Sequence, residues 1–183
     1  PTMAIEWYEE RPEGSIIKDL RAWRTTVSAL PNPIHTAFYE LILFTGFRKS
    51  EAFTLEWKHV HEDRIHLPMT KNGRSFDLPI LQHHHEIIAP LRGLDAQWVF
   101  PSPKSAKGHL TSPQRLEWSP HAHRRTFATV AMEAGVLEEV VGRLLNHTPI
   151  SITGQRYAKP SLDALRPSME TVCNELLQRT GEA

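Results

Sequence analysis

The chain has 183 residues, 40% of them hydrophobic, and equal numbers of basic and acidic side chains, 21 of each. This composition is typical of a globular chain that can bury a core, and it argues against a disordered tail or a polycation. A single cysteine excludes a disulfide framework, and the longest apolar run, residues 41–44, is too short to cross a bilayer, so we expect a protein of the reducing cytoplasm.

Hydrophobic periodicity and the positions of Pro and Gly predict a mainly α chain with one small antiparallel β-sheet, an α+β fold. Helices are expected at 15–30, 34–44, 48–58, 81–91, 120–134 and 137–146, and extended segments at 64–69 and 75–80. Gly46 and Gly135 are suited to end two of these helices, and Ser119 followed by Pro120 is a strong helix start. The dipeptide Asn72-Gly73 between the extended segments is typical of a hairpin turn.

The last part of the chain is predicted to be helical. Its apolar residues have the spacing of a single helical stripe, formed by Met169, Val172, Cys173, Leu176 and Leu177. Such a stripe is typical of a helix packed on its own core.

Eleven histidines suggest a metal site, but their spacing argues against one. His83, His84 and His85 are consecutive on a predicted helix, where neighbouring side chains diverge by about 100°. His121 and His123 are two apart and diverge as well. The sequence contains no His-Glu-x-x-His, Gly-x-Ser-x-Gly or Gly-rich phosphate motif. We therefore expect no metal and no nucleotide cofactor, and a serine hydrolase is disfavoured.

Three short segments contain groups suited to binding an anion. His121 and Arg124 are three apart near a predicted helix start, where free N–H groups favour negative charge. Arg48 also stands at a predicted helix start, and a helix ending at His147 precedes Tyr157 by ten residues. Taken singly, each segment has an ordinary alternative: a solvated arginine, an arginine paired with a nearby glutamate, or a tyrosine buried in the core.

Together, and in this order, the segments resemble the catalytic domain of the tyrosine recombinases, the phage integrase family. The resemblance covers about residues 41–159. Residues 45–52 (TGFRKSEA) resemble the family's motif with the first catalytic arginine, and Lys71 resembles its hairpin lysine. Residues 120–129 (PHAHRRTFAT) resemble its His-x-x-Arg motif, residues 145–147 (LNH) its Leu-Gly-His motif, and Tyr157 its nucleophile. His123 stands where the family usually has leucine, which raises the question of packing behind the second arginine. Asn146 stands in place of glycine, and since Asn tolerates the left-handed conformation, we expect the turn to persist.

The resemblance implies a tyrosine recombinase catalytic-domain fold over residues 1–183, with 161–183 as a helical tail and no N-terminal core-binding domain in this chain. It also implies a site-specific recombinase, or integrase, that cuts and rejoins DNA through a 3′-phosphotyrosyl intermediate without metal. The implied catalytic residues are Arg48, Lys71, His121, Arg124, His147 and Tyr157. The arginines would bind the phosphate, Tyr157 would attack it, and Lys71 would protonate the leaving 5′-oxygen. His121 would accept the tyrosine proton or position the phosphate, and His147 would hydrogen-bond the scissile phosphate.

The charge is unevenly distributed. Residues 102–125 contain five cations against one carboxylate, whereas both ends of the chain are acidic. The cations outside the active site that are candidates for contacting flanking DNA phosphates are Lys104, Lys107, Arg115 and Arg125. For the two lysines a merely solvated loop is the alternative.

The implied partners are double-stranded DNA, further copies of the chain in a tetramer on DNA with a monomer otherwise, and accessory DNA-bending proteins. No membrane is implied, and the location would be the cytoplasm, associated with the nucleoid. The C-terminal stripe would then either pack on its own core or dock on a neighbouring copy. Two other functions stay open: a DNA-binding module with an idle active site, and a relaxase similar to type IB topoisomerases.

Overall fold

The computed structural model describes residues 16–70, 73–147 and 161–182. These residues form a mainly helical structure with one two-stranded antiparallel sheet, which confirms the predicted α+β class. The elements are α1 (Leu20–Ser28), α2 (Pro33–Thr45), α3 (Lys49–Phe53), η1 (Trp57–His59), β1 (Arg64–Leu67), β2 (Phe76–Pro79), α4 (Gln82–Ile88), η2 (Ala89–Leu91), α5 (Pro120–Glu133), α6 (Glu138–Leu144) and α8 (Leu162–Thr180). None of the helices in these ranges is both long and apolar enough to span a membrane.

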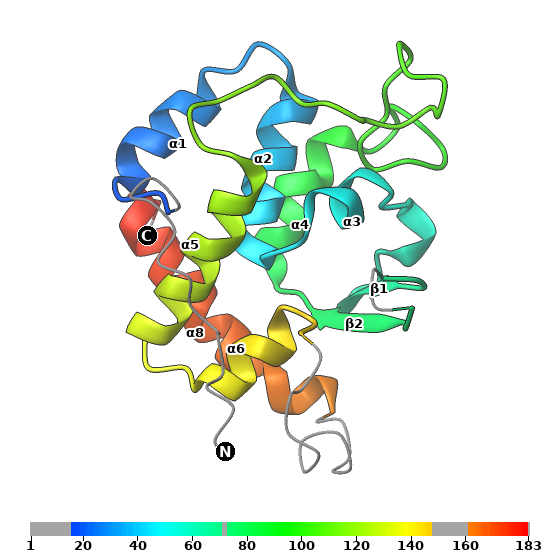
Figure 1. The fold of residues 1–183 in the computed structure, drawn as a ribbon. Helices are drawn as coiled ribbons and strands as arrows, with labels where there is room; N and C mark the ends of the chain where they lie inside the picture. The colour runs from blue at the N-terminus through cyan, green and yellow to red at the C-terminus, as the bar shows by residue number, and fades with distance from the viewer. Residues whose placement is uncertain (1–15, 71–72, 148–160, 183) are drawn as a thin grey trace, which may run out of the picture.

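Helix α2 lies at the centre of the described structure, with α1, α3, α4, α5 and α8 packed around it (Figure 1). Every residue from Ala37 to Thr45 is buried, as expected for a helix that is apolar on nearly all sides. The Asn32 side chain caps its start by accepting a hydrogen bond from the Ile34 N–H. Gly46 ends the helix in the left-handed conformation, with φ +66°, as its position in the sequence predicted.

The sheet is the predicted hairpin. Strand β1 pairs with β2 so that Arg64 lies opposite Pro79 and Leu67 opposite Phe76. Beyond the strands, the Thr70 N–H donates to the Arg74 carbonyl at 3.1 Å, which extends the pairing toward the turn.

Helix α8 packs on the chain's own core. Most of the predicted apolar stripe is buried, namely Met169, Val172, Cys173 and Leu176. This face contacts α1, α2, α5 and α6, and the start of the helix contacts the sheet. Arg166 donates to the carbonyls of Ile80 and Asp63, both at 3.0 Å, and so ties the start of α8 to the ends of the two strands. The stripe therefore has an intramolecular partner.

Two predicted helices, 15–30 and 48–58, are longer by six residues or more than those in the structure, and tertiary contacts explain both differences. The first begins at Leu20, because the Asp19 side chain caps it and the Ile17 N–H donates instead to the Thr126 hydroxyl of α5. The predicted helix 48–58 ends at Phe53, because the following residues 55–57 run beside 97–99 and exchange two backbone hydrogen bonds with them.

Candidate functional site

Arg124 is held between the ends of two helices. Its side chain leaves α5, and the residue is only 6% exposed. One terminal nitrogen donates to the Gly46 carbonyl at 2.5 Å and the other to the Leu145 carbonyl at 2.6 Å. Both carbonyls belong to the residues that cap the C-termini of α2 and α6, so the cation lies at the negative ends of two helix dipoles. Burial, reinforced by the nearby Arg48 charge, lowers the pKa of Arg124 to about 10, so it remains charged at neutral pH.

The two acceptors are held together by close packing around Gly46. A Cβ at this position would lie 2.5 Å from Cδ2 of Leu145 and 2.9 Å from Cδ1 of Phe127. Such contacts are shorter than real Cβ atoms make, so only glycine lets the end of α2 approach α5 and α6 this closely. The same residue thus provides a left-handed turn, a close contact and one acceptor for Arg124.

Arg48 begins α3 and is oriented by Glu51. Its guanidinium donates to one carboxylate oxygen of Glu51 at 2.8 Å, and its backbone N–H donates to the other at 2.8 Å. The Arg48 side chain is 24% exposed, whereas that of Glu51 is 7% exposed. The local Arg–Glu pair considered from the sequence is therefore present. It does not remove Arg48 from the site, because the Arg48 charge acts on both Arg124 and His147.

His147 follows α6 through a turn that Asn146 makes possible. Asn146 has φ +51° in the left-handed region, and its N–H donates to the Arg143 carbonyl at 3.0 Å. The His147 N–H donates to the Gly142 carbonyl at 2.8 Å, which completes a Schellman motif. The prediction that Asn146 would keep the turn is confirmed.

The His147 side chain reaches the surface close to the two arginines. Partial desolvation, followed by the positive charges of Arg124 and Arg48, lowers its pKa to about 4. The imidazole is therefore neutral at pH 7 and can donate one hydrogen bond while accepting another. Arg48, Arg124 and His147, which are distant in sequence, thus lie near enough for the charges of the two arginines to act on one another and on the imidazole.

Of the three other predicted catalytic residues, the structure describes His121 alone. His121 lies exposed in the first turn of α5, on the helix that also contains Arg124, three residues later. This spacing keeps the two on the same side of the helix. Lys71 and Tyr157 lie outside the described residues.

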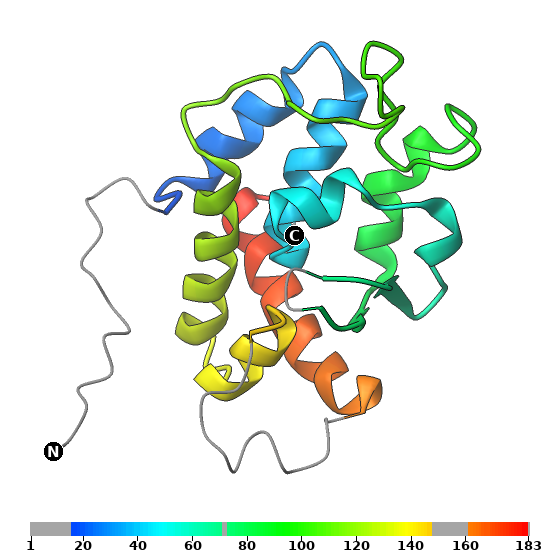
Figure 2. The ribbon, with the colours of Figure 1, turned by 45° about the vertical axis from the view of Figure 1, so that its right-hand side comes forward.

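The predicted DNA-contacting cations are spread along the surface before and within α5. Lys104 and Lys107 are exposed in a loop closed by a hydrogen bond from the Ser102 N–H to the Gly108 carbonyl. In both views this loop is at the upper end of the molecule, whereas α6 is at the lower end (Figure 2). Arg115 is exposed in the segment that leads to α5, and Arg125 is half-buried on α5 itself.

The consecutive histidines of α4 diverge as the sequence predicted. His84 is fully buried, where its Nε2–H donates to the Phe44 carbonyl at 3.0 Å. The His83 ring packs on the Phe44 ring, and His85 donates to the Glu62 carbonyl at 3.0 Å. Over residues 16–70, 73–147 and 161–182, no three His, Cys, Asp or Glu side chains meet in a way that could hold a metal ion.

The packing behind Arg124, the second arginine of the motifs, is provided by His123. It is fully buried, lies between the rings of Trp23 and Tyr39, and accepts a hydrogen bond from Trp23 Nε1 at 2.8 Å. Its other ring nitrogen donates to the Ser119 carbonyl at 2.9 Å. The space is therefore filled and both ring nitrogens are bonded. No local pattern in the sequence signals a pairing with a residue 100 positions away.

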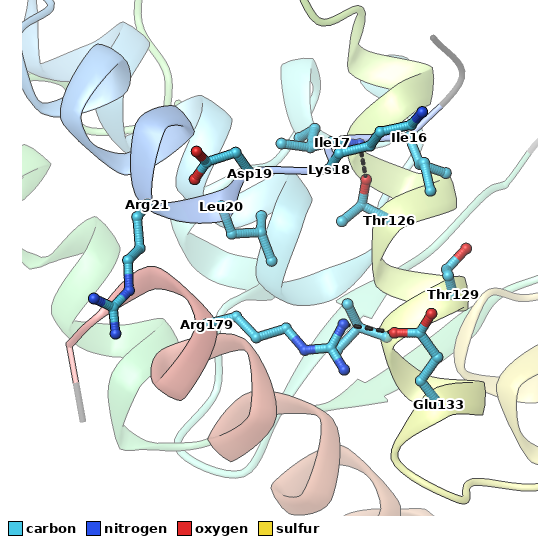
Figure 3. A pocket seen from close by; sticks show the side chains of 11 residues that line it. Ile16, Ile17, Lys18, Asp19, Leu20, Arg21, Thr126, Thr129, Glu133 and Arg179 are labelled. Atoms are coloured by element: carbon cyan, nitrogen blue, oxygen red, sulfur yellow. Dashed lines mark hydrogen bonds and ion pairs between the residues drawn. The ribbon is translucent and has the colours of Figure 1, made fainter. Parts of the chain in front are cut away.

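A surface pocket of about 590 Å³ is lined by residues other than Arg48, Arg124 and His147 (Figure 3). It is formed by residues 16–21 together with side chains of α5 and α8, among them Thr126, Glu133 and Arg179. An ion pair at 2.5 Å joins Arg179 to Glu133 across it, and the Ile17 N–H donates to Thr126 at its edge. None of the predicted site residues that the structure describes lines this pocket.

Comparison with known sequences identifies relatives over most of the chain. The sequence profile of the phage integrase family matches residues 25–163. The chain is similar to prophage integrase IntF of Escherichia coli (strain K12), with 26% identity over 190 residues that cover 90% of this chain and 39% of that protein. It is also similar to tyrosine recombinase XerC of Erythrobacter litoralis, with 29% identity over 153 residues that cover 73% of this chain and 49% of that protein. The chain thus spans less than half the length of either relative.

Solved structures share the fold. The integrase from mycobacterium phage Brujita superposes with a TM-score of 0.63 and 22% identity, covering 93% of this chain and 65% of that one. The Tn1549 transposon integrase, solved in complex with circular intermediate DNA, gives a TM-score of 0.57 and 17% identity, covering 88% of this chain and 66% of that one. These similarities confirm the predicted recombinase catalytic-domain fold.

Proposed function

The chain belongs to the phage integrase family, and we propose that it acts as a site-specific DNA recombinase that cuts and rejoins strands through a 3′-phosphotyrosyl link. The main support is the placement of Arg124. Two helix-end carbonyls hold its guanidinium where it shares one region with Arg48 and His147. Two guanidiniums and a neutral imidazole are suited to a phosphodiester, which has one negative charge and two non-bridging oxygens.

The arginines would bind the scissile phosphate. Each guanidinium presents a planar fork of N–H groups, and Arg124 uses two of its five donors for the carbonyls of Gly46 and Leu145. The anion would replace the mutual repulsion of the two cations with attraction to both. Removing one such contact to the transition state typically lowers the rate by about 10²–10³-fold. His147 would donate a further hydrogen bond to the phosphate.

The bond exchange needs three more groups, proposed from the family resemblance. The Tyr157 hydroxyl oxygen would attack phosphorus while the bond to the 5′-oxygen breaks, giving a 3′-phosphotyrosine. The phenolic proton would pass to His121, and Lys71 would protonate the departing 5′-oxygen. Rejoining is the reverse reaction with a 5′-hydroxyl from another strand. One phosphodiester is exchanged for another at each step, so the scheme uses no metal or nucleotide.

The partner would be double-stranded DNA, bound as a tetramer that assembles from monomers on the DNA with the help of accessory DNA-bending proteins. Lys104, Lys107, Arg115 and Arg125 would contact phosphates that flank the cleavage point, the two lysines farther along the duplex because their loop and α6 lie at opposite ends of the molecule. Such contacts add affinity without reading sequence, and their loss would flatten the salt dependence of binding. Residues 1–183 would form one catalytic domain, with the C-terminal helix as its tail, and it would act at the nucleoid.

A covalent-trapping assay tests this proposal. Overlapping nicked duplexes from DNA flanking the chain's own gene would be incubated with the chain, and denaturing gels would reveal any protein–DNA adduct. We expect an adduct with the unaltered chain, none with Tyr157→Phe, and about 100-fold slower formation with Arg124→Lys. The matched control is Arg179→Lys, whose cation pairs with Glu133 and Glu175 away from the cluster and should leave the rate unchanged.

The other outcomes identify the alternatives. DNA binding without an adduct would contradict the proposal and indicate a binding module with an idle site. An adduct accompanied by relaxation of supercoiled DNA, with no exchange between two duplexes, would indicate a relaxase.

A further inference from the structure

The His123 ring has a single hydrogen-bonding state. The Trp23 indole can only donate, so His123 Nε2 must be unprotonated to accept its N–H at 2.8 Å. The ring hydrogen is then on Nδ1, which donates to the Ser119 carbonyl at 2.9 Å. Both Trp23 and His123 are fully buried, so water cannot replace either partner of the bond between them. The imidazole is thus held as one neutral tautomer between α1 and the start of α5.

The Ser119 carbonyl accepts the first backbone hydrogen bond of α5. Ser119 is the N-cap residue, and its hydroxyl and carbonyl oxygens both accept hydrogen bonds from the Ala122 N–H, at 3.2 and 2.9 Å. The His123 ring adds a side-chain bond to the same carbonyl. It therefore fixes the cap from inside the protein, while the His121 side chain of the same turn is exposed.

The ring is also fixed on its other sides. It lies against the rings of Trp23 and Tyr39, with centroids at 5.8 and 5.1 Å. The Tyr39 hydroxyl donates to the Gln114 carbonyl at 2.7 Å, in the segment that leads to Ser119. The two helices α1 and α2 thus act on the first turn of α5 through one imidazole.

We infer that His123 is a positioning residue: its bond to Ser119 fixes the first turn of α5 and, with it, the placement of His121 and Arg124 at the phosphate. An apolar side chain could fill the same volume but would leave the Trp23 N–H without a partner and the cap carbonyl without its side-chain bond. The catalytic consequence rests on the proposed function; the effect on the helix start does not.

The test compares His123→Leu with Thr126→Val. Thr126 lies on the same face of α5 one turn later, is buried, accepts a hydrogen bond from the segment before α1 and donates one to the Ala122 carbonyl at 2.8 Å. It therefore contacts the same turn without touching the Ser119 cap, which makes it a demanding control. Two quantities are measured: the solvent-exchange rate of the Ala122 N–H by NMR, and the single-turnover rate of adduct formation at saturating nicked DNA. We expect His123→Leu to speed the exchange far more than Thr126→Val does. It should also slow adduct formation by about 10- to 100-fold, with DNA affinity unchanged.

Two further variants separate the two bonds of the ring. Asparagine at position 123 keeps a donor for the Ser119 carbonyl, whereas glutamine keeps an acceptor for the Trp23 N–H. We expect His123→Asn to retain the slow exchange of the Ala122 N–H and most of the rate of adduct formation, and His123→Gln to lose both. If His123→Leu does not fold, this comparison decides whether the bond to Ser119 positions the helix start. Equal exchange and equal rates for His123→Leu and Thr126→Val would overturn the inference. If the unaltered chain forms no adduct, the recombinase proposal fails, and the exchange rates alone decide whether His123 fixes the helix start.

Discussion

Gly46→Ala should be far more damaging than one added methyl group suggests. The backbone at Gly46 is left-handed, with φ +66°, a conformation that costs an L-residue about 1–2 kcal/mol. The added Cβ would also lie 2.5 Å from Leu145 and 2.9 Å from Phe127, and forced repacking of a core typically costs about 1–3 kcal/mol. We therefore expect the free energy of unfolding to fall by about 2–5 kcal/mol.

Gly135→Ala provides the matched control. Gly135 is also left-handed, with φ +85°, but a Cβ added there would meet no atom of residues 16–70, 73–147 and 161–182 within 4 Å. It should cost only the conformational part, about 1–2 kcal/mol. The difference between the two variants, about 1–3 kcal/mol, then measures the close approach of α2 to α5 and α6. Urea unfolding curves for both variants and the unaltered chain supply the comparison.

The same substitution tests the link from packing to the site, because a displaced Gly46 would move one of the two acceptors of Arg124. Adduct formation should therefore be slower in Gly46→Ala than in Gly135→Ala at a temperature where both are folded. Equal losses of stability in the two variants would refute the reasoning, since the contact with Leu145 and Phe127 would then have no energetic weight.

Three further predictions concern other parts of the fold. Burial lowers the pKa of His84 and of His123 to about 4, below the ordinary value of about 6.5, so the unfolded chain binds more protons between these values. Stability should fall as the pH drops from about 6.5 to 4, by up to about 1.4 kcal/mol per pH unit for each histidine, and a flat acid profile of urea unfolding would contradict this. Gly142→Ala should raise the unfolding free energy by up to about 1 kcal/mol, because among the described residues the new Cβ meets only Cβ of His147, at 3.9 Å, and alanine favours the helix; a lower unfolding free energy would show that the space around Gly142 is tighter than this. Arg166→Met removes two contacts to carbonyls at the strand ends and should cost about 1–3 kcal/mol, with hydrogen exchange rising first at the start of α8; uniform exchange along α8 would count against the anchoring role.

Local sequence signals predicted the elements well where a single residue determines the backbone conformation. Ser119 and Pro120 predicted the start of α5, Gly46 the end of α2, and the turn signal at Asn72-Gly73 the hairpin, because capping and left-handed conformations are properties of single residues. The helix predicted to reach residue 58 was too long, since the pairing of 55–57 with 97–99 is a tertiary contact that no local pattern encodes.

The residue types of the site were predictable, but their partners were not. The order of the motifs singled out Arg48, Arg124 and His147. It gave no sign that Arg124 would be held by backbone carbonyls, which lie 78 and 21 residues away. Backbone groups have no residue identity to recognise, so only the fold reveals them as acceptors. The bond between His123 and Trp23 was missed for a related reason, because a buried polar pair so far apart in sequence leaves no periodic pattern.

The most direct test of the central claim is to identify the residue joined to DNA. The adduct trapped on nicked duplexes would be digested with protease and nuclease, and mass spectrometry would locate the modified peptide and the linked nucleotide end. We predict a phosphate linkage between Tyr157 and a 3′ DNA end, formed by the unaltered chain and nearly absent in Arg48→Lys and Arg124→Lys. Attachment through any other residue, or linkage to a 5′ end, would contradict the claim that Tyr157 attacks a phosphate held by the two arginines.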